Sequence, residues 1–326
     1  MKDVYILAIE SSCDETSIAI IKNGCTVESC TVLTQMDTHA EFGGVVPEIA
    51  SRMHTENITL VLEEIDAIAV TYAPGLLGSL LVGIEFAKTL ALVYKKPLIA
   101  VHHTIGHIYA NALEQKLQFP LLALVVSGGH TDLILMKEDY QFTILGSTLD
   151  DAIGECFDKV ARILDLKYPG GPNVEKLALK GKPTYEMPKP VNDSSYNFSF
   201  SGLKSHIINF VHNEQQRGHE IRKEDLACSF QVTAIDEVVR KVELALKNIK
   251  VKELIIAGGV AASGYLRGEI KELADKYQVP LSIPEMKYCT DNAAMIGAAA
   301  YPLFLKSQFV DFSLNAKSQA SIVEME

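Results

Sequence analysis

Apolar and polar positions follow one another in the same order in both halves of this chain. YILAIESSCDETSIAII, near the N-terminus, predicts a strand, a polar turn and a second strand. LLALVVSGGHTDLILM repeats that pattern and aligns Ser12 with Ser127 and Thr16 with Thr131. Alternation of this kind is typical of a half-buried β-hairpin. Each half is therefore expected to begin with a hairpin whose turn carries small and polar residues.

Each half then continues with a strand, a small-residue loop, a helix and another strand, at 66–101 and at 253–284. Pro280–Leu281 repeats Pro97–Leu98 at the start of the last strand. The predicted fold class is α/β, a duplicated two-lobe arrangement of the actin/Hsp70/sugar-kinase (ASKHA) type, in which such loops surround the phosphates of a nucleotide. Two unrelated α/β layers are the alternative. Lobe I is expected at 1–108, joined by a C-terminal helix at 300–326, and lobe II at 109–299.

Composition narrows the class of protein. The chain has 326 residues, 48% of them hydrophobic, and six cysteines that form no CxxC pair. No apolar run of membrane-spanning length is evident, so a cytoplasmic protein with reduced thiols and no membrane contact is expected. The net charge of −11 argues against a broad basic face for nucleic acid. The segment 159–205, with eight basic and four acidic residues, is the best place on the chain for phosphates to bind, although a run of this kind is usually just a solvated face.

Two histidines are candidates for metal ligation. His103 and His107 are four residues apart in VHHTIGHIYAN, after the apolar run PLIAV. On a helix this spacing puts both imidazoles on one face, as two ligands of one metal ion require. Asp291 begins the small-residue helix DNAAMIGAAAY, where it is either an N-cap or a third, oxygen ligand. The alternative for the pair is a chance feature of an amphipathic helix.

Glycine-rich loops and acidic residues suggest a site for a phosphorylated ligand. Ser127-Gly128-Gly129-His130 and Gly258-Gly259 allow backbone N–H groups to approach an anion. PGGP at 169–172 predicts a rigid turn after a helix whose Asp158 could face the same cleft. Asp14 and Glu15 are expected to be exposed in the first hairpin turn, where they could accept a proton or simply form an acidic turn. The absence of GxxxxGK[ST] excludes a P-loop enzyme.

Nine motifs together resemble one family from about residue 3 to 302. They are ESSCDETS at 10–17, VVPEIASRMH at 45–54, HHTIGH at 102–107, VSGGHT at 126–131, DDAIGECFDKVAR at 150–162, YPGGP at 168–172, FSFSGLK at 198–204, AGGVAASGYLR at 257–267 and CTDNAAMIG at 289–297. In this order they resemble the bacterial TsaD family of tRNA N6-adenosine threonylcarbamoyltransferases, formerly misnamed O-sialoglycoprotein endopeptidases. Several of the motifs are long enough to be specific individually.

The resemblance implies transfer of a threonylcarbamoyl group from threonylcarbamoyl-AMP to N6 of adenosine 37 in tRNAs that read ANN codons, with release of AMP. It implies that His103, His107 and Asp291 hold one Fe²⁺, with Zn²⁺ possible in purified protein, and that Asp14 and Glu15 position or deprotonate the amine. The implied adenylate site is lined by Val126, Ser127, Gly128, Gly129, His130, Asp158, Gly171, Glu175 and Ser263. The implied partners are tRNA, a smaller paralogue of the same fold (TsaB-like) and a P-loop ATPase (TsaE-like).

The sequence departs from the family pattern at three positions. Ser263 replaces an asparagine, which puts one adenylate contact in doubt, Ile105 replaces a glutamate common in bacterial members, and Glu175 replaces an aspartate. Three other classes of protein are the alternatives. A metallopeptidase needs the glutamate of HExxH, which HTIGH lacks. A small-molecule kinase of this fold needs no histidine pair, and a non-catalytic assembly partner would lack the three ligands together.

Overall fold

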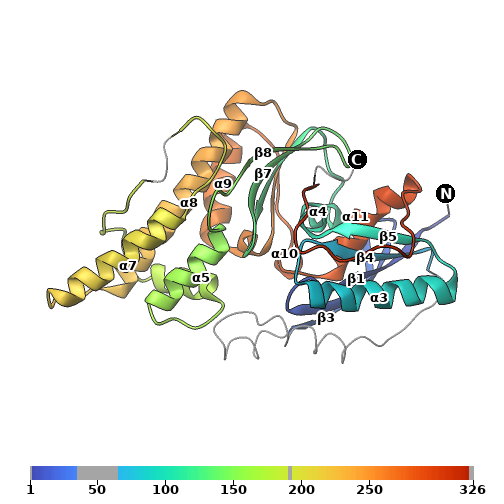
Figure 1. The fold of residues 1–326 in the computed structure, drawn as a ribbon. Coiled ribbons are helices and arrows are strands. Elements are labelled where there is room, and N and C mark those ends of the chain that lie inside the picture. The colour runs from blue at the N-terminus through green and yellow to red at the C-terminus, as the bar shows by residue number, and fades with distance from the viewer. Residues whose placement is uncertain (1, 35–64, 190–192, 323–326) are drawn as a thin grey trace. The chain divides into compact units, whose positions relative to one another are not determined.

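The computed structural model describes residues 2–34, 65–189 and 193–322 (Figure 1). The motif VVPEIASRMH, with His54, and also His39 lie outside these described residues. The chain divides into two compact units. Unit 1 comprises Met1–Leu117, Asp139–Phe142 and Pro284–Glu326, and unit 2 comprises Gln118–Glu138 and Thr143–Ile283. Unit 1 thus takes in Asp291, which the boundaries expected from the sequence assigned to the other lobe.

Unit 1 is built on a five-stranded sheet with the order β3-β2-β1-β4-β5. Strands β1 and β2 are antiparallel, whereas β1, β4 and β5 run parallel. The strands are β1 Tyr5–Glu10, β2 Glu15–Lys22, β3 Thr26–Thr34, β4 Ala67–Ala73 and β5 Leu98–His102, and the helices are α3 Leu77–Tyr94, α4 His103–Tyr109, η1 Ala110–Leu113, α10 Met286–Cys289 and α11 Ala293–Leu305. Both predicted segments of the first half, the hairpin and the strand–helix–strand, are therefore present.

Alternating side chains of β1 bury both faces of this sheet. Ile9 points to the face covered by α3, where it packs in one core cluster with Leu80 and Ile84. Ala8 points to the other face, where a Cβ on Gly297 of α11 would lie 3.3 Å from the Ala8 Cβ. Because successive residues of a strand face opposite sides, a strand buried on both faces is apolar throughout, as β1 is until Glu10.

Unit 2 repeats this plan. Its sheet has the order β10-β9-β6-β7-β8, with β6 antiparallel to β7 and parallel to β9, and β9 parallel to β10. The strands are β6 Leu121–Val126, β7 Thr131–Met136, β8 Phe142–Ser147, β9 Glu253–Ala257 and β10 Leu281–Ser282, and the helices are α5 Ile153–Ile163, α6 Gly170–Ala178, α7 Ser201–Gln216, α8 Lys223–Asn248, η2 Gly259–Ala262 and α9 Gly264–Tyr277.

The duplication is confirmed strand by strand, because β6 to β10 take the places in their sheet that β1 to β5 take in theirs. The two prolines that suggested it occupy equivalent contacts. Ile68 N–H donates to the Pro97 carbonyl at 3.0 Å, and Leu254 N–H donates to the Pro280 carbonyl at 2.8 Å. The fold is thus α/β with two related units, as expected for the ASKHA type.

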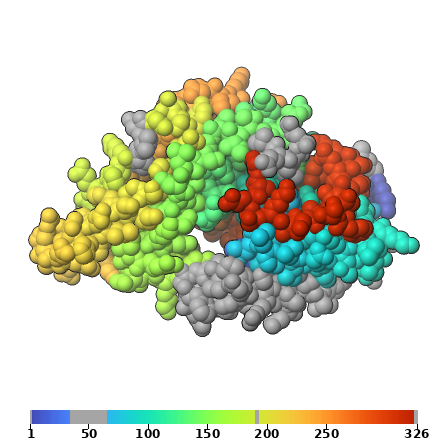
Figure 2. All heavy atoms as spheres, viewed as in Figure 1, coloured from blue at the N-terminus to red at the C-terminus, as the bar shows by residue number. Residues whose placement is uncertain are grey.

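Two expectations about helices need correction. Helix α11 ends at Leu305, and the described residues after it, up to 322, include no α-helix in place of the one expected over 300–326. This segment lies against unit 1 instead, in red beside the cyan of α3 in Figure 2. Val310 forms a bridge to Leu98, and Lys317 N–H donates to the Tyr72 carbonyl at 3.0 Å. Backbone pairing with the sheet edge replaces further helical turns.

Helix α3 is also more apolar than expected. By length and composition alone, Leu77–Tyr94 could cross a membrane, contrary to the expectation of no such segment. Its inner side, which includes Leu80, Ile84 and Ala87, belongs to the hydrophobic core of unit 1. A helix that is buried against a sheet can be as apolar as a membrane-spanning helix. The packing of α3 in this core supports burial as the reason for its composition.

Candidate functional site

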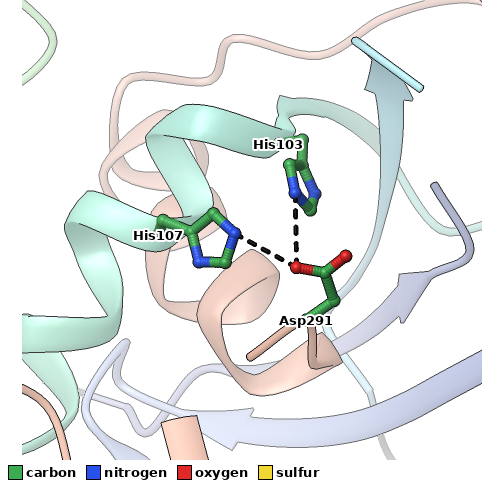
Figure 3. Close-up of side chains that lie close together, drawn as sticks. All are labelled: His103, His107 and Asp291. Atoms are coloured by element: carbon green, nitrogen blue, oxygen red, sulfur yellow. Dashed lines mark ion pairs between the residues drawn. The ribbon is translucent and has the colours of Figure 1, made fainter. Parts of the chain in front are cut away.

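The three predicted metal ligands meet in unit 1 (Figure 3). His103 and His107 lie on α4, which starts directly after β5, and their rings face the same side with centroids 4.7 Å apart. Asp291 lies just before α11. The N-cap of that helix is Asn292, whose side chain accepts from Met295 N–H at 3.0 Å, and not Asp291 as one reading of the sequence had it. The Asp291 carboxylate is therefore free to face the imidazoles.

The spacing of these donor atoms suits one metal ion. His103 Nε2 and His107 Nε2 lie 3.4 and 3.1 Å from Asp291 Oδ1, and the three ligand atoms lie within 4.8 Å of one another. Tetrahedral ligands with bonds of 2.0–2.1 Å are separated by about 3.3 Å. In addition, both ring nitrogens of His107 are buried without a hydrogen-bond partner. A cation between the three side chains would satisfy His107 Nε2, so the residues fit a metal centre.

The electrostatics of the triad also favour a positive charge there. Burial by itself would raise the pKa of Asp291, but the charge of His103 and contacts with both imidazoles hold it well below its usual range. Burial would lower the pKa of His103, but the carboxylates of Asp291 and Glu10 raise it well above its usual range. Without a metal ion the carboxylates thus keep a proton on His103. A bound cation can take the place of that proton.

Glu10, a residue that was not singled out from the sequence, extends this cluster. It ends β1 and is fully buried, and its Oε2 lies 3.2 Å from His103 Nδ1, on the side of the ring away from Asp291. The sequence signal that could have identified Glu10 is an acidic residue at the end of an apolar strand. Buried carboxylates commonly contact the outer nitrogen of a metal-binding imidazole.

Asp14 and Glu15 lie close to the triad but are less exposed than expected. Asp14 is buried, and Glu15 is partly buried at the first position of β2. Burial, with the negative charges of Asp291 and Asp14, raises the pKa of Glu15 to about 10. Because the charge of Asp291 repels the charge of Glu15, these two carboxylates share one electrostatic environment. A cation bound by Asp291 would weaken that repulsion.

The predicted glycine loop between β6 and β7 lies in unit 2 and is folded around Ser127. The hydroxyl of Ser127 accepts from Gly129 N–H at 3.3 Å and from His130 N–H at 3.0 Å. A Cβ at Gly128 or Gly129 would meet no atom within 4 Å, so the loop leaves space beside its backbone. Such a backbone surface suits the close approach of a ligand.

Gly258 ties the second glycine loop to the first. Its φ is +92°, and a Cβ there would lie 2.4 Å from the backbone oxygen of Val126. Only glycine both adopts this positive φ readily and leaves room for the Val126 oxygen. Gly259, in contrast, faces open space. The end of β9 and the end of β6 therefore lie side by side in unit 2.

The PGGP segment is the start of a helix and not the turn expected from its composition. Helix α6 begins at Gly170, because Asp158 of α5 accepts from Gly170 N–H at 2.7 Å and also from Gly171 N–H. Burial raises the pKa of Asp158, although these two N–H groups oppose the shift. A carboxylate at a helix start satisfies N–H groups that have no partner within the helix.

Glu175 and Ser263 meet at the start of α9. Glu175 Oε1 accepts from Tyr265 N–H at 2.9 Å, and Ser263 Oγ accepts from Leu266 N–H at 3.3 Å. Ser263 is thus the N-cap of α9. The predicted adenylate residues form one connected part of unit 2, while the metal ligands with Asp14 and Glu15 form another part, in unit 1.

The basic segment at 159–205 is partly neutralised within unit 2. Lys159 and Lys204 both form ion pairs with Asp151, at 2.8 and 2.7 Å. The neighbouring Asp150 accepts from the backbone N–H and the hydroxyl of Ser201 at the start of α7. The motifs DDAIGECFDKVAR and FSFSGLK are therefore joined by charge pairs and hydrogen bonds. These ion pairs lower the number of unpaired basic side chains that the segment offers to phosphates.

Comparison with known proteins places the chain in a family. The model of the family described as TsaD, tRNA N6-adenosine threonylcarbamoyltransferase, matches residues 26–298. Proteins named tRNA N6-adenosine threonylcarbamoyltransferase from Staphylococcus haemolyticus and Anoxybacillus flavithermus are each 52% identical, over 99% and 97% of this chain and 98% and 96% of theirs. The protein of that name from Staphylococcus aureus is 49% identical over 99% of this chain and 98% of its own.

Solved structures bear on the fold alone. Full-length HypF in a phosphate- and nucleotide-bound form is 14% identical and superposes with a TM-score of 0.63, over 97% of this chain and 47% of HypF. HypF of T. kodakarensis gives 0.62 at 14% identity, over 95% and 49%. The duplicated α/β fold is shared with these proteins at identities too low to carry function. By the family match and the full-length identity of its relatives, the chain belongs to the tRNA N6-adenosine threonylcarbamoyltransferase family of acyltransferases.

Proposed function

We propose that this chain transfers the threonylcarbamoyl group of threonylcarbamoyl-AMP to N6 of adenosine 37 in tRNAs that read ANN codons. The product is N6-threonylcarbamoyladenosine, and AMP is released. One observation carries the proposal: a chain about half identical to named transferases over its full length keeps His103, His107 and Asp291 within reach of one ion. A non-catalytic relative would have no use for such a buried set of polar groups.

The proposed cofactor is one Fe²⁺ per chain, with Zn²⁺ as a substitute in purified protein. His103 Nε2, His107 Nε2 and Asp291 Oδ1 would hold it, and two nitrogens with one oxygen suit either metal. When bound, such an ion polarises an acyl oxygen and stabilises negative charge that develops toward a phosphate. Three protein ligands leave positions open for oxygen atoms of a substrate.

The proposed roles of Asp14 and Glu15 concern the attacking amine. In the reaction, the N6 nitrogen forms a bond to the carbamoyl carbon, the bond from that carbon to the phosphate oxygen breaks, and AMP takes the electron pair. The amine loses one proton, which needs an acceptor. Asp14 and Glu15 lie in the same electrostatic environment as Asp291, so they are the carboxylates that we assign to orient the amine or accept its proton.

The proposed adenylate site uses Val126 to His130, Asp158, Gly171, Glu175 and Ser263. Open backbone at Gly128 and Gly129 suits contact with the phosphate. The carboxylates of Asp158 and Glu175 would repel a phosphate but accept hydrogen bonds from sugar hydroxyls. Phosphate and ribose are thereby assigned to different parts of the site. Ser263, already bonded to Leu266 N–H, would contribute a shorter contact than the family's usual asparagine.

The proposed partners are tRNA, a smaller paralogue of the same fold and a P-loop ATPase, in the cytoplasm. A net charge of −11 and the pairing of Lys159 and Lys204 with Asp151 support weak tRNA binding by the isolated chain. The paralogue and the ATPase would then supply part of the tRNA-binding surface. Tight tRNA binding by the chain alone, insensitive to salt, would contradict this part of the proposal.

The test is a transfer assay with threonylcarbamoyl-AMP, an ANN-decoding tRNA and the candidate partners, followed by nucleoside analysis and measurement of metal content. One Fe or Zn per chain with modification of adenosine 37 is the expected result. The control is the same tRNA with adenosine 37 replaced, which should stay unmodified. Peptide hydrolysis or phosphorylation of a small molecule, without modified tRNA, would refute the proposal.

A further inference from the structure

Glu10 is a buried glutamate at a strand end that contacts one of the candidate metal ligands. Its side chain is fully buried at the end of β1. Oε1 accepts from Ser12 N–H at 2.6 Å, and Oε2 accepts from the Thr71 hydroxyl at 2.6 Å. Oε2 also lies 3.2 Å from His103 Nδ1. The carboxylate thus joins β1, β4 and the start of α4 at one point.

The donor and acceptor roles in these contacts determine which ring nitrogen of His103 carries the hydrogen. An ionised carboxylate can only accept, so the contact with Glu10 requires the hydrogen to be on Nδ1. The Ser12 hydroxyl, 3.0 Å from the same nitrogen, can share that N–H as a second acceptor. Nε2 of the neutral ring then keeps its lone pair. That nitrogen is the one 3.4 Å from Asp291 Oδ1.

We infer that Glu10 is a positioning residue for the candidate metal centre: by accepting the Nδ1 hydrogen, it holds His103 in the tautomer and orientation in which Nε2 can bind a cation. The inference rests on the metal site proposed above. Carboxylate partners of this kind usually raise metal affinity by 10–100-fold. Nδ1 of His107 lacks such a partner, so the described part of the chain orients one imidazole more firmly than the other.

Glu10→Gln tests this with almost no change of shape. Ser12 N–H is a backbone donor and cannot reverse, so the amide oxygen must face Ser12 and the amide NH₂ must face His103. The Thr71 hydroxyl can rotate to accept, and His103 Nδ1 becomes an acceptor. The hydrogen then moves to Nε2, which is the position needed for the metal. The substitution therefore opposes metal binding through the tautomer and leaves the packing intact.

Glu253→Gln is the matched control. Glu253 is the other fully buried glutamate on a described strand, and it also accepts from a backbone N–H, that of Gln118, and from a hydroxyl, that of Ser282. It belongs to unit 2, whereas the triad belongs to unit 1. Both substitutions replace one buried carboxyl group by an amide. Only Glu10→Gln changes the partner of a candidate ligand.

The measurement is the affinity of the full chain for Zn²⁺ and Co²⁺, by competition with a chromophoric chelator, together with the visible spectrum of the Co²⁺-loaded protein. We expect Glu10→Gln to weaken binding about 10–100-fold and alter the spectrum, and Glu253→Gln to change neither. If Glu10→Gln does not fold, Thr71→Val, which removes one hydrogen bond to Oε2, should weaken binding several-fold while Ser282→Ala does not.

Three results would overturn the inference: unchanged affinity in Glu10→Gln, or in Thr71→Val where it is the variant tested; equal weakening in Glu253→Gln; or a loss in Ser12→Ala that Glu10→Gln does not share. The last result would make Ser12, and not Glu10, the partner that orients His103. Failure of the wild-type chain to bind either metal is a different outcome, because it refutes the proposed metal site itself. Metal binding by the wild type with full affinity in Glu10→Gln refutes only the role of Glu10.

Discussion

Replacing His107 by alanine should separate metal binding from folding. Nδ1 of His107 is buried without a hydrogen bond, and an atom of this kind costs about 1–3 kcal/mol. Removing the ring leaves a cavity, which costs a similar amount. These contributions oppose each other, so we expect the free energy of unfolding of the metal-free variant to stay within about 2 kcal/mol of wild type. The fold should therefore survive.

The effect of metal should differ sharply between the two proteins. At a free metal concentration 100 times Kd, binding to the native state adds about 2.7 kcal/mol of stability. For a chain of 326 residues that unfolds in one step, this raises Tm by about 4 °C, and by roughly twice that if unit 1 unfolds separately. His107→Ala, with two of three ligands left, should show almost no shift and almost no threonylcarbamoyl transfer.

His102→Ala is the matched control, measured by the same thermal melts with and without Zn²⁺. His102 precedes the pair, is equally buried and also has an unpaired ring nitrogen, but its Nε2 contacts the Ala320 carbonyl at 3.1 Å. It should keep the metal-induced rise in Tm and bind metal at one ion per chain. If His107→Ala keeps full metal occupancy, the same rise in Tm and full transfer, the ligand assignment is wrong and the histidine pair is only the buried face of α4.

Three further substitutions test unit 2. Gly258→Ala should destabilise the chain by at least about 2 kcal/mol, because φ is +92° and the new Cβ would lie 2.4 Å from the Val126 backbone oxygen. Gly259→Ala, which meets open space, should melt within about 1 °C of wild type, and equal losses in both variants would contradict the steric argument. Ser263→Asn should keep stability within about 0.5 kcal/mol, since both residues cap helices well. Its affinity for AMP, measured by calorimetry, should equal or exceed wild type, and a clear loss would show that the hydroxyl has a role of its own.

The fold could be predicted because its evidence is local. The hairpins and the strand–helix–strand segments each carry their own hydrophobic period, and the duplication needed only a comparison of the two halves. Pro97 and Pro280 illustrate this, because equal positions in sequence became equal backbone contacts. The helix expected over 300–326 failed for the opposite reason. The chain after α11 pairs with the sheet through Val310 and Leu98, and these two residues are far apart in the sequence.

The candidate site was predictable only as far as its residues carry a pattern. His103 and His107 have helical spacing, and Asp291 opens a helix, so all three could be named. Asp291 and the adjacent Asn292 were both candidates for the N-cap of α11. Asn292 is the N-cap, because its side-chain oxygen accepts a hydrogen bond from Met295 N–H. Burial was the harder property. Asp14 in a polar turn is expected to be exposed, yet tertiary packing covers it.

Glu10 shows what topology adds to pattern. Strands β1, β4 and β5 are parallel neighbours, so their carboxyl ends meet at one edge of the sheet, where ligand sites of α/β proteins collect. Glu10 ends β1, Thr71 lies near the end of β4, and His103 directly follows β5. Glu10 and Thr71 are unremarkable in their own segments, and only the strand order brings them to His103. A search for polar residues at the ends of adjacent parallel strands would have found Glu10 once that order was known.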